Sequence, residues 1–258
     1  MNFNDLISLV SSRRNTVTLH PKYLFRGQIN SMWRLDPSFS RLAKNKNLNR
    51  KQALQLEREC INKFSISARN LLPLDKTISL QPNHNGDIDF LGWATVMQHY
   101  SAPTRLLDWS CSPWVALYFA CCDGWDSDAS LFIADFDKVV REGNRIGRDK
   151  GKNIIELMLG SASEDILQFI MPLNTNERIE AQQGRFSVCT NPLTDHAEII
   201  SNIGALEEIN IKKEIKHEIM EHLYQMNITA KTLYPGIDGL GKSTYEYCNM
   251  WDTESILD

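Results

Sequence analysis

Residues 99–122 read HYSAPTRLLDWSCSPWVALYFACC, and the two halves of this stretch differ in character. The second half, from Pro113 onward, is a continuous apolar run of the kind that lies in a protein core. The first half places His, Tyr, Thr, Arg, Asp, Trp and Ser within about a dozen residues. Ser112 followed by Pro113 is typical of a helix start, because serine caps the first amides and proline fits the first turn. The stretch therefore predicts a buried helix over 113–122 that supports a polar pocket.

Patterns on both sides of this stretch predict a mixture of helices and strands. Residues 51–71 carry apolar side chains at three- and four-residue spacing, which indicates an amphipathic helix. Asp87 is a suitable cap for a second helix that runs to about Tyr100. Strands are predicted at 22–27, 128–136, 184–190 and 207–213. Further helices are predicted at 153–160, 163–171 and 213–227. A charged loop is expected from residue 137.

Composition and charge restrict the class of protein. The chain has 258 residues, 42% of them hydrophobic and 23% charged, which is ordinary for a soluble globular protein. It contains neither an internal repeat nor a Gly/Ser linker, so we expect a single domain over 1–258 with residues 1–20 as a lead-in segment. The net charge of −4 argues against a dedicated duplex-binding protein, although a nucleic acid remains open as a substrate.

Cysteine usage and the N-terminus predict a reduced, cytoplasmic protein without a membrane segment. The six cysteines form no C-x-x-C pair, and the first basic residues follow the short apolar N-terminal stretch, the reverse of a signal peptide. No run reaches the length of a membrane span. We expect no metal site, although a mixed site is conceivable from four residues that lack recognisable ligand spacing: His99, Cys121, Cys122 and His196.

The segment GIDGLGKS (236–243) fits the phosphate-loop pattern G-x-x-x-x-G-K-[ST]. A working phosphate loop needs a strand before it and further strands and a metal-binding acidic residue after it. The sequence after Ser243 is too short for these parts. We therefore expect a turn and a terminal helix here, with Lys242 at the surface.

Four segments together resemble the FRG domain, which is named for its Phe-Arg-Gly motif. They are YLFRGQ (23–28), QHYSAPTRLLDWSCSPWVALYFA (98–120), RIEAQQGRFSV (178–188) and ITAKTLYPGIDGLGKS (228–243). The resemblance covers nearly the whole chain in the right order. It also accounts for the phosphate-loop match, since chains of that family end in a Pro–x–x–x–Gly turn before a helix.

The FRG domain in turn is similar to the ADP-ribosyltransferase fold, which implies an α+β protein. Its core would be a split, mixed or antiparallel β-sheet with surrounding helices. Arg26-Gly27 corresponds to the arginine on the first strand, and Ser110-Cys111-Ser112 before Ala-Leu-Tyr-Phe-Ala (116–120) corresponds to the Ser-x-Ser element. The third element departs from the pattern, because Glu180 is followed two residues later by Gln182 instead of glutamate.

This resemblance implies an enzyme that uses NAD as its substrate. Such an enzyme cleaves the bond between nicotinamide and ribose and transfers ADP-ribose to a macromolecular acceptor, either a protein or a nucleic acid. The implied biological role is a bacterial toxin or antiphage effector, with an antitoxin or regulatory protein as a partner. The alternative is a catalytically inactive module that binds a nucleotide or a protein, because an amide at Gln182 stabilises a cation far less than a carboxylate does.

The chemistry of this reaction suggests roles for the residues that match. Arg26 suits the pyrophosphate, because its planar fork makes paired charge-assisted hydrogen bonds. Gly27 lacks a Cβ and so admits the nicotinamide amide close to the backbone. Glu180 would supply negative charge to the developing ribose cation, whereas Gln182 and Gln183 would orient a ribose hydroxyl.

Further candidates flank the buried helix. His99 and Tyr100 are expected in the pocket wall, and the pKa range of histidine suits activation of a target nucleophile. Ser110 and Ser112 are expected to contact the dinucleotide. Structural alternatives stay open: an Arg26 pair with Asp108 or Asp36, an Arg105–Asp108 pair, helix capping by both serines, a turn at Gln182-Gln183-Gly184, and core positions for His99, Trp109 and Trp114.

Overall fold

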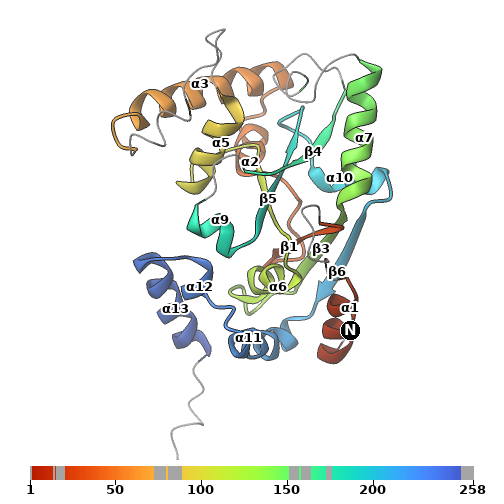
Figure 1. The fold of residues 1–258 in the computed structure, drawn as a ribbon, viewed down its shortest axis with the longest axis vertical. Helices are drawn as coiled ribbons and strands as arrows, with labels where there is room; N and C mark the ends of the chain where they lie inside the picture. The colour runs from red at the N-terminus through yellow and green to blue at the C-terminus, as the bar shows by residue number, and fades with distance from the viewer. Residues whose placement is uncertain are drawn as a thin grey trace, which may run out of the picture.

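A six-stranded sheet with the strand order β4-β5-β2-β1-β3-β6 runs through the protein, and every neighbouring pair is antiparallel (Figure 1). The structure is a computed structural model that describes residues 2–13, 15, 21–72, 80, 89–150, 157, 164–172 and 176–250. The α+β class is thus confirmed, with an antiparallel sheet. The strands are β1 Tyr23–Gln28, β2 Leu107–Ser110, β3 Ala129–Asp135, β4 Leu167–Ile170, β5 Gly184–Cys189 and β6 Leu206–Ile211.

The sheet opens between β1 and β2. These strands share one register pair, Phe25 with Ser110, whereas β1 pairs with β3 at every residue from Tyr23 to Gln28. The expected split is therefore an opening within one continuous sheet. Because β1 continues beyond Phe25 without a ladder to β2, the space between the two strands is available to side chains.

Helices cover both faces of the sheet. On one face α6, α1 and α11 share a core with β1, β3 and β6, and on the other face α7 and α10 pack against the sheet (Figure 1). The helices are α1 Phe3–Ser12, α2 Ser38–Asn45, α3 Arg50–Ala68, α5 Phe90–His99, α6 Pro113–Cys121, α7 Phe136–Asp149, α9 Glu177–Ala181, α10 His196–Asn202, α11 Lys216–Gln225, α12 Ala230–Leu233 and α13 Ile237–Met250, with a 3-10 turn, η2, at Lys213–Ile215.

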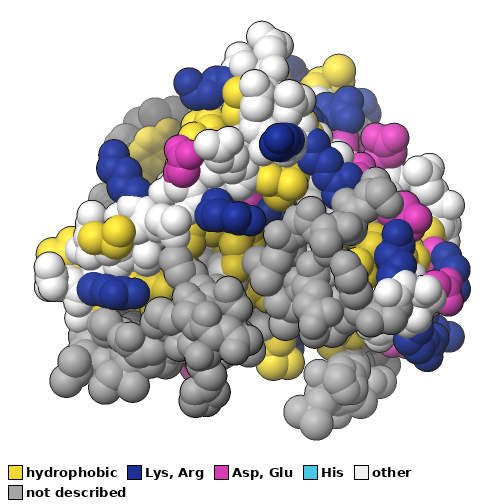
Figure 2. Space-filling view, turned by 90° about the horizontal axis from the view of Figure 1, so that it is seen from above, with side chains coloured by type: hydrophobic (Ala, Val, Ile, Leu, Met, Phe, Trp, Pro, Cys, Tyr) yellow, Lys and Arg dark blue, Asp and Glu magenta, His cyan; other side chains and the backbone are white. Residues whose placement is uncertain are grey.

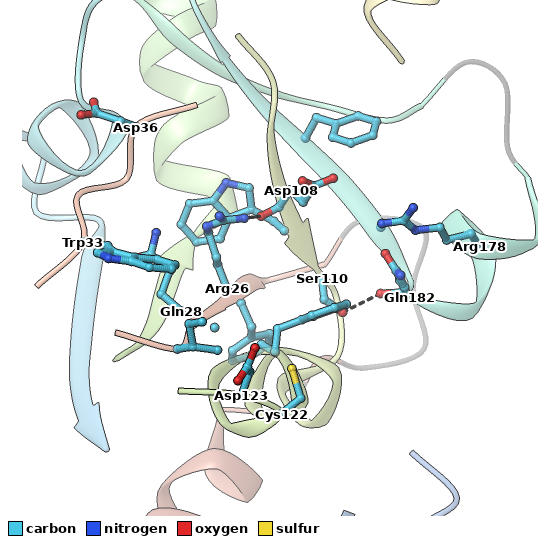
Figure 3. Close-up of a pocket in the computed structure, with 18 of the residues that line it drawn as sticks. Arg26, Gln28, Trp33, Asp36, Asp108, Ser110, Cys122, Asp123, Arg178 and Gln182 are labelled. Atoms are coloured by element: carbon cyan, nitrogen blue, oxygen red, sulfur yellow. Dashed lines mark hydrogen bonds between the residues drawn. The ribbon is translucent and has the colours of Figure 1, made fainter. Parts of the chain in front are cut away.

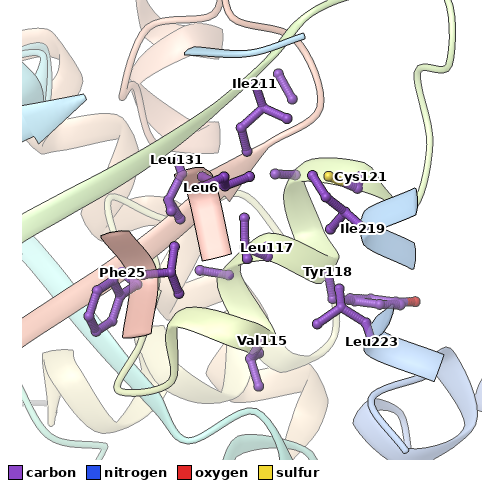
Figure 4. Packing of buried hydrophobic residues seen from close by; sticks show 14 of the residues in the cluster. Leu6, Phe25, Val115, Leu117, Tyr118, Cys121, Leu131, Ile211, Ile219 and Leu223 are labelled. Atoms are coloured by element: carbon purple, nitrogen blue, oxygen red, sulfur yellow. The ribbon is translucent and has the colours of Figure 1, made fainter. Parts of the chain in front are cut away.

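The central helix α6 is buried, as its sequence predicts. The Ser112 side chain accepts a hydrogen bond from the Val115 amide at 3.4 Å, so Ser112 caps the helix. Leu117 is fully buried between side chains from α1, β1 and α11, including Leu6, Phe25 and Leu223 (Figure 4). Helix α6 is thus enclosed by the sheet and by both neighbouring helices.

Gly27 lets α6 approach β1 closely. A Cβ at this position would lie 1.9 Å from the Ala116 carbonyl oxygen and 2.5 Å from the Ala120 amide nitrogen. Both neighbours are backbone atoms inside a helix, and they have no rotamer with which to move away. The glycine in the Phe-Arg-Gly motif is therefore required by packing.

We expect Gly27→Ala to destabilise the fold by about 3 kcal/mol or more, because overpacking against backbone exceeds the usual overpacking penalty of about 1–3 kcal/mol. Denaturant unfolding followed by circular dichroism measures this change. Gly241→Ala is the matched control, since a Cβ there meets nothing within 4 Å. Equal stability of the two variants would contradict the packing role of Gly27.

Most predicted helices and strands are present, but two segments have a different secondary structure from the one predicted. Residues 163–171 were expected to be helical, which is wrong: β4 Leu167–Ile170 pairs with β5 there. The loop expected from residue 137 is also wrong, since it belongs to α7, which Asp135 caps through the Lys138 amide. The buried side of α7 carries Val139, Gly143 and Gly147, and two glycines within a helix lower its helix propensity.

Helix α5 begins later than predicted, at Phe90. Its cap is Asp89, whose side chain accepts from the Gly92 amide at 2.9 Å. The predicted cap Asp87 lies outside the described residues, as does most of the predicted helix 153–160.

The charged side chains, the cysteines and the helix lengths bear on the class of protein. On the face in Figure 2, Lys and Arg side chains are dispersed, with Asp and Glu side chains between some of them. All six cysteines are free thiols. Within the described residues, no helix is long and apolar enough to cross a membrane, and no three His, Cys, Asp or Glu side chains are grouped as metal ligands.

Candidate functional site

A cavity of about 760 Å³ lies where β1 and β2 diverge (Figure 3). Its walls come from β1, β2, the loop after β1, the C-terminal end of α6, and α9. The volume is in the range of sites that hold a nucleotide-sized ligand. We call this space the larger cavity.

Arg26 lies at the centre of the larger cavity (Figure 3). Its Nη1 spans the opening of the sheet and donates to the Asp108 carbonyl oxygen at 2.6 Å. Its Nε is buried and has no hydrogen-bond partner among the described residues. The expected alternative of a carboxylate pair is wrong, because no carboxylate of the described residues lies within ion-pair distance of Arg26. The arginine therefore presents a fixed positive charge with unused donor capacity.

The charge environment of Arg26 has two further features. Burial lowers the pKa of Arg26, and nearby Arg41 lowers it further, while Asp108 raises it. Arginine nevertheless stays protonated, because its unperturbed pKa is far above neutral. The neighbouring Gln28 is buried and its Oε1 also lacks a partner among the described residues. The cavity wall thus contains polar atoms that a ligand or water must satisfy.

Three further arginines line the larger cavity, and each is held by a contact. Arg34 forms an ion pair with Asp195 at 3.0 Å, and Arg41 donates to the Asp36 carbonyl oxygen at 2.6 Å. Arg178 lies over the Tyr234 ring, with its Cζ 4.7 Å from the ring centroid. Planar guanidinium groups held in this way suit the oxygens of phosphate groups.

Aromatic rings border the same cavity. Trp33, in the loop after β1, is 54% exposed, which is high for this residue type, and it lies on one side of Arg26 (Figure 3). Phe119 and Tyr234 also line the cavity and meet edge to face at 6.3 Å. Burial raises the pKa of Tyr234, so its hydroxyl stays protonated. Such rings can stack on a flat heterocycle.

The predicted serines have structural roles. Ser110 lines the larger cavity, but its Oγ donates to the Gln182 carbonyl oxygen at 2.8 Å and accepts from the Ser112 amide at 3.0 Å. Ser112 caps α6 and does not line the cavity. The backbone approach that Gly27 permits is that of α6, although Gly27 also lines the cavity.

The predicted polar residues around position 180 separate in the structure. Glu180 is exposed on α9 and lines neither cavity at this site, so the structure does not place it beside Arg26. Gln182 does line the cavity, and its Nε2 donates to the Leu233 carbonyl oxygen at 3.0 Å. Gln183 has a positive φ of 49° and its carbonyl accepts from the Cys111 amide, which makes it a turn residue.

A smaller cavity of about 290 Å³ adjoins the larger one. Both are lined by Asp108, Arg178, Ile179, Gln182 and Phe186, so these residues form the shared wall. We call this space the smaller cavity.

His99 lines the smaller cavity, and its Nδ1 lies 3.2 Å from Asn176 Nδ2. Asn176 Oδ1 accepts from the Ile179 amide, which fixes the amide orientation, so Nδ2 donates and His99 Nδ1 accepts. The lone pair of Nδ1 is thus already used, which disfavours the predicted role as a base through this atom. Tyr100 packs beside His99 at 4.8 Å but is 55% exposed and lines neither cavity.

Arg105 braces the fold away from the cavities. The expected pair with Asp108 is wrong: Arg105 Nε donates to Glu57 Oε1 of α3 at 2.7 Å. Its Nη1 also donates to the Cys189 carbonyl oxygen at 3.1 Å. Since both charged side chains are at most 4% exposed, this is a buried ion pair that joins α3 to the chain before β2.

Lys216 holds two edges of the larger cavity together. Its Nζ donates to the carbonyl oxygens of Ile29, Asp123 and Gly124 at 2.9, 3.2 and 2.8 Å. Burial lowers the pKa of this lysine. Ile29 and Asp123 both line the cavity, so the side chain fixes loops that shape it.

A buried hydrogen-bond chain supports β2 behind the cavity. Trp109 Nε1 donates to Ser187 Oγ at 2.8 Å, so the Ser187 hydroxyl hydrogen is directed to His196 Nδ1, also at 2.8 Å. Burial lowers the pKa of His196 to about 3, and the charges of Arg26, Lys44 and Arg105 act in the same direction. His196 is thus neutral in the folded protein, and Trp109 is a core residue as expected.

We expect this histidine to make folding sensitive to acid. The unfolded chain protonates His196 near pH 6.5, whereas the folded protein does so near pH 3, so stability falls as the pH drops from about 6.5 towards 3. Between pH 7 and about pH 5 the loss from this residue is about 2 kcal/mol. Urea unfolding at both pH values, compared with His196→Gln, measures it. A wild-type pH dependence that persists unchanged in the variant would contradict this assignment.

The phosphate-loop match lies inside a helix. Helix α13 begins at Ile237, so Gly239, Gly241 and Lys242 have helical backbone and do not form an open phosphate-binding loop. A Cβ at Gly239 would lie 1.8 Å from the Tyr234 carbonyl oxygen, which gives this glycine a packing role. The predicted turn and helix are confirmed.

The family comparison agrees with the central segments. Residues 21–129 match the family model of the FRG domain, and the protein carries an FRG domain over these residues. The match contains β1, the Phe-Arg-Gly motif, β2 and α6, which together form one side of the larger cavity. No match was found among curated proteins or among solved structures.

Several site residues were not singled out by the sequence. Gln28 and Trp33 follow the Phe-Arg-Gly motif, and Arg178 stands two residues before Glu180 in the segment that resembles the family. Their proximity to matching motifs was the available signal. Tyr234 also lies in a segment that resembles the family (228–243), but only the fold brings it beside α9.

Proposed function

We propose that this protein is an ADP-ribosyltransferase-like enzyme that cleaves NAD between nicotinamide and ribose and transfers ADP-ribose to a macromolecular acceptor. The antiparallel sheet that opens beside the first-strand arginine supports an ADP-ribosyltransferase-like fold. Arg26 carries the proposal, because it is a central arginine whose buried Nε has no partner among the described residues. A pyrophosphate would satisfy this donor.

The rest of the larger cavity suits the other parts of NAD. Arg34, Arg41 and Arg178 add positive charge around Arg26, and Trp33 offers a face for a planar ring. NAD, as the substrate, supplies the reactive glycosidic bond. The residues present therefore fit a dinucleotide in charge, ring contacts and volume.

The proposed function includes an acceptor, a cellular setting and a biological role. The acceptor is a protein or a nucleic acid, and the setting is the cytoplasm. A toxin or antiphage effector with a neutralising partner fits an enzyme that would consume NAD.

An inactive binding module is the second candidate. It is favoured by the exposed position of Glu180, which leaves the predicted carboxylate outside both cavities. Such a module would bind the dinucleotide through Arg26 and release it unchanged.

Calorimetric titration tests the binding part of the proposal. We expect NAD and ADP-ribose to bind at one site per chain and to compete, because both contain the pyrophosphate. Adenosine, which lacks phosphate, should bind far more weakly. If none of the three produces heat or protects the protein from thermal unfolding, the proposed function is wrong.

A further inference from the structure

Asp108 is the carboxylate at the junction of the two cavities. It lies on β2, beside Arg26, and its side chain belongs to the wall that the cavities share (Figure 3). The Arg26 bond to the Asp108 carbonyl oxygen fixes the spacing between the arginine and this residue. A ligand held by Arg26 in the larger cavity would thus have Asp108 nearby.

The Asp108 carboxylate is held in one orientation by a hydrogen bond. Gln98 Nε2 donates to its Oδ2 at 2.7 Å, and Gln98 is itself oriented by a hydrogen bond from Thr104 Oγ1. Among the described residues, Asp108 forms no ion pair. Asp36, another carboxylate of the larger cavity, instead pairs with Lys44 at 2.5 Å.

Several neutral donors in the wall of the smaller cavity already have acceptors within the protein. The hydroxyl groups of Ser38 and Thr95 donate to the carbonyl oxygens of Thr104 and Leu91, and the Gln98 amide donates to Asp108. Asp108 is the only carboxylate among the described residues that line this cavity, and Arg178 lies in the same wall. The cavity therefore suits a group that donates a hydrogen bond, such as water, a hydroxyl or an amine.

We propose that the smaller cavity is the site of the attacking nucleophile and that Asp108 is the catalytic carboxylate facing both it and the ribose. This inference rests on the proposed function and assigns to Asp108 the charge that the sequence had suggested for Glu180. The nucleophile is of the class that carries hydrogen on the attacking atom, which excludes carboxylates.

The proposed reaction breaks one bond at ribose C1′ and forms another there. The bond between nicotinamide and ribose C1′ breaks, and its electron pair leaves with nicotinamide. The negative charge of Asp108 stabilises the cation that develops on the ribose. The nucleophile attacks C1′ from the smaller cavity, and Asp108 accepts its proton. With water, the products are nicotinamide, ADP-ribose and one proton.

The test compares nicotinamide release by four proteins: the wild type, Asp108→Asn, Glu180→Gln and Glu177→Gln. We expect Asp108→Asn to release nicotinamide about a hundredfold more slowly or worse, because it removes a preorganised charge. Its Kd for ADP-ribose should stay within about threefold of wild type, since the ground-state ribose is neutral. Glu180 and Glu177 lie on α9 and line neither cavity, so their variants should match the wild type.

The nucleophile class is tested with methanol and acetate as small probes. We expect the wild type to form methyl ADP-riboside from NAD and methanol, and no acetyl ester from acetate, while Asp108→Asn loses the methanol product. Wild-type rates in Asp108→Asn, a collapse in Glu180→Gln or an acetate adduct would overturn the inference. A wild type that consumes no NAD would instead overturn the proposed function. Asp108→Ala, together with melting temperatures, separates a chemical effect from misfolding.

Discussion

Glu57→Ala is expected to lower the free energy of unfolding by about 3–5 kcal/mol, because it removes one partner of a buried ion pair. Both side chains are at most 4% exposed, so water cannot replace the lost partner without opening the fold. The bonds from Arg105 to the Cys189 and Thr190 carbonyl oxygens remain, but they do not supply a counter-charge. Urea unfolding at neutral pH measures the loss.

Glu142→Ala is the matched control for this prediction. Its partner Arg145 is 56% exposed, so the loss of that pair should cost less than about 1 kcal/mol. The double variant Glu57→Leu/Arg105→Met should recover much of the stability lost by Glu57→Ala, since it removes both buried charges. Similar small losses from Glu57→Ala and Glu142→Ala would show that the buried pair does not brace the fold.

Arg26→Lys is expected to weaken NAD binding about a hundredfold, which corresponds to about 3 kcal/mol. Lysine keeps the positive charge but cannot reproduce the fork that reaches both Asp108 and a phosphate. Arg26→Ala should weaken binding at least as much. Calorimetric titration with NAD gives both Kd values.

Arg178→Lys provides a control for general electrostatics. Arg178 lies over Tyr234 in the wall that the two cavities share, and Arg26 lies at the centre of the larger cavity, so Arg178→Lys should weaken binding less than Arg26→Lys. Circular dichroism and thermal unfolding must show that the Arg26 variants are folded. If folded Arg26→Lys binds NAD as tightly as the wild type, Arg26 does not hold the pyrophosphate.

The sequence predicted elements best where local chemistry and burial agree. Ser112-Pro113 and the apolar run after it specify α6 without help from distant residues. Residues 163–171 were assigned wrongly, because β4 depends on pairing with β5, a contact that periodicity alone does not reveal. The loop expected in place of α7 reflects its many charged residues and the low helix propensity of Gly143 and Gly147, although its apolar residues recur at helical spacing.

Site residues that belong to a recognisable motif could be predicted from the sequence. Site residues that only the packing of distant elements brings together could not. Arg26 was found because it belongs to the Phe-Arg-Gly motif, and the structure places it at the centre of the cavity. Glu180 shares a short helix with Arg178, yet it is Arg178 that lines the cavity. The helical rotation between these two residues decides which one reaches the site, and only the docking of α9 sets that rotation.

The sequence also did not reveal that Asp108 lies in the wall of both cavities. Its neighbour Arg105 made a local ion pair plausible, but Glu57, far away in the chain, takes that arginine. Asp108 is thereby left to Gln98 and to the junction of the cavities. Long-range pairing thus leaves Asp108 without Arg105 as an ion-pair partner.

Incubation of the purified protein and cell lysate with NAD labelled separately in its nicotinamide and adenosine parts tests the central claim most directly. The account predicts that wild-type protein releases free nicotinamide and that the adenosine label becomes attached to protein or nucleic acid. Arg26→Lys should do neither at a comparable rate. Recovery of intact NAD, bound by the wild type but never cleaved in the presence of lysate, would contradict the account and identify a binding module instead.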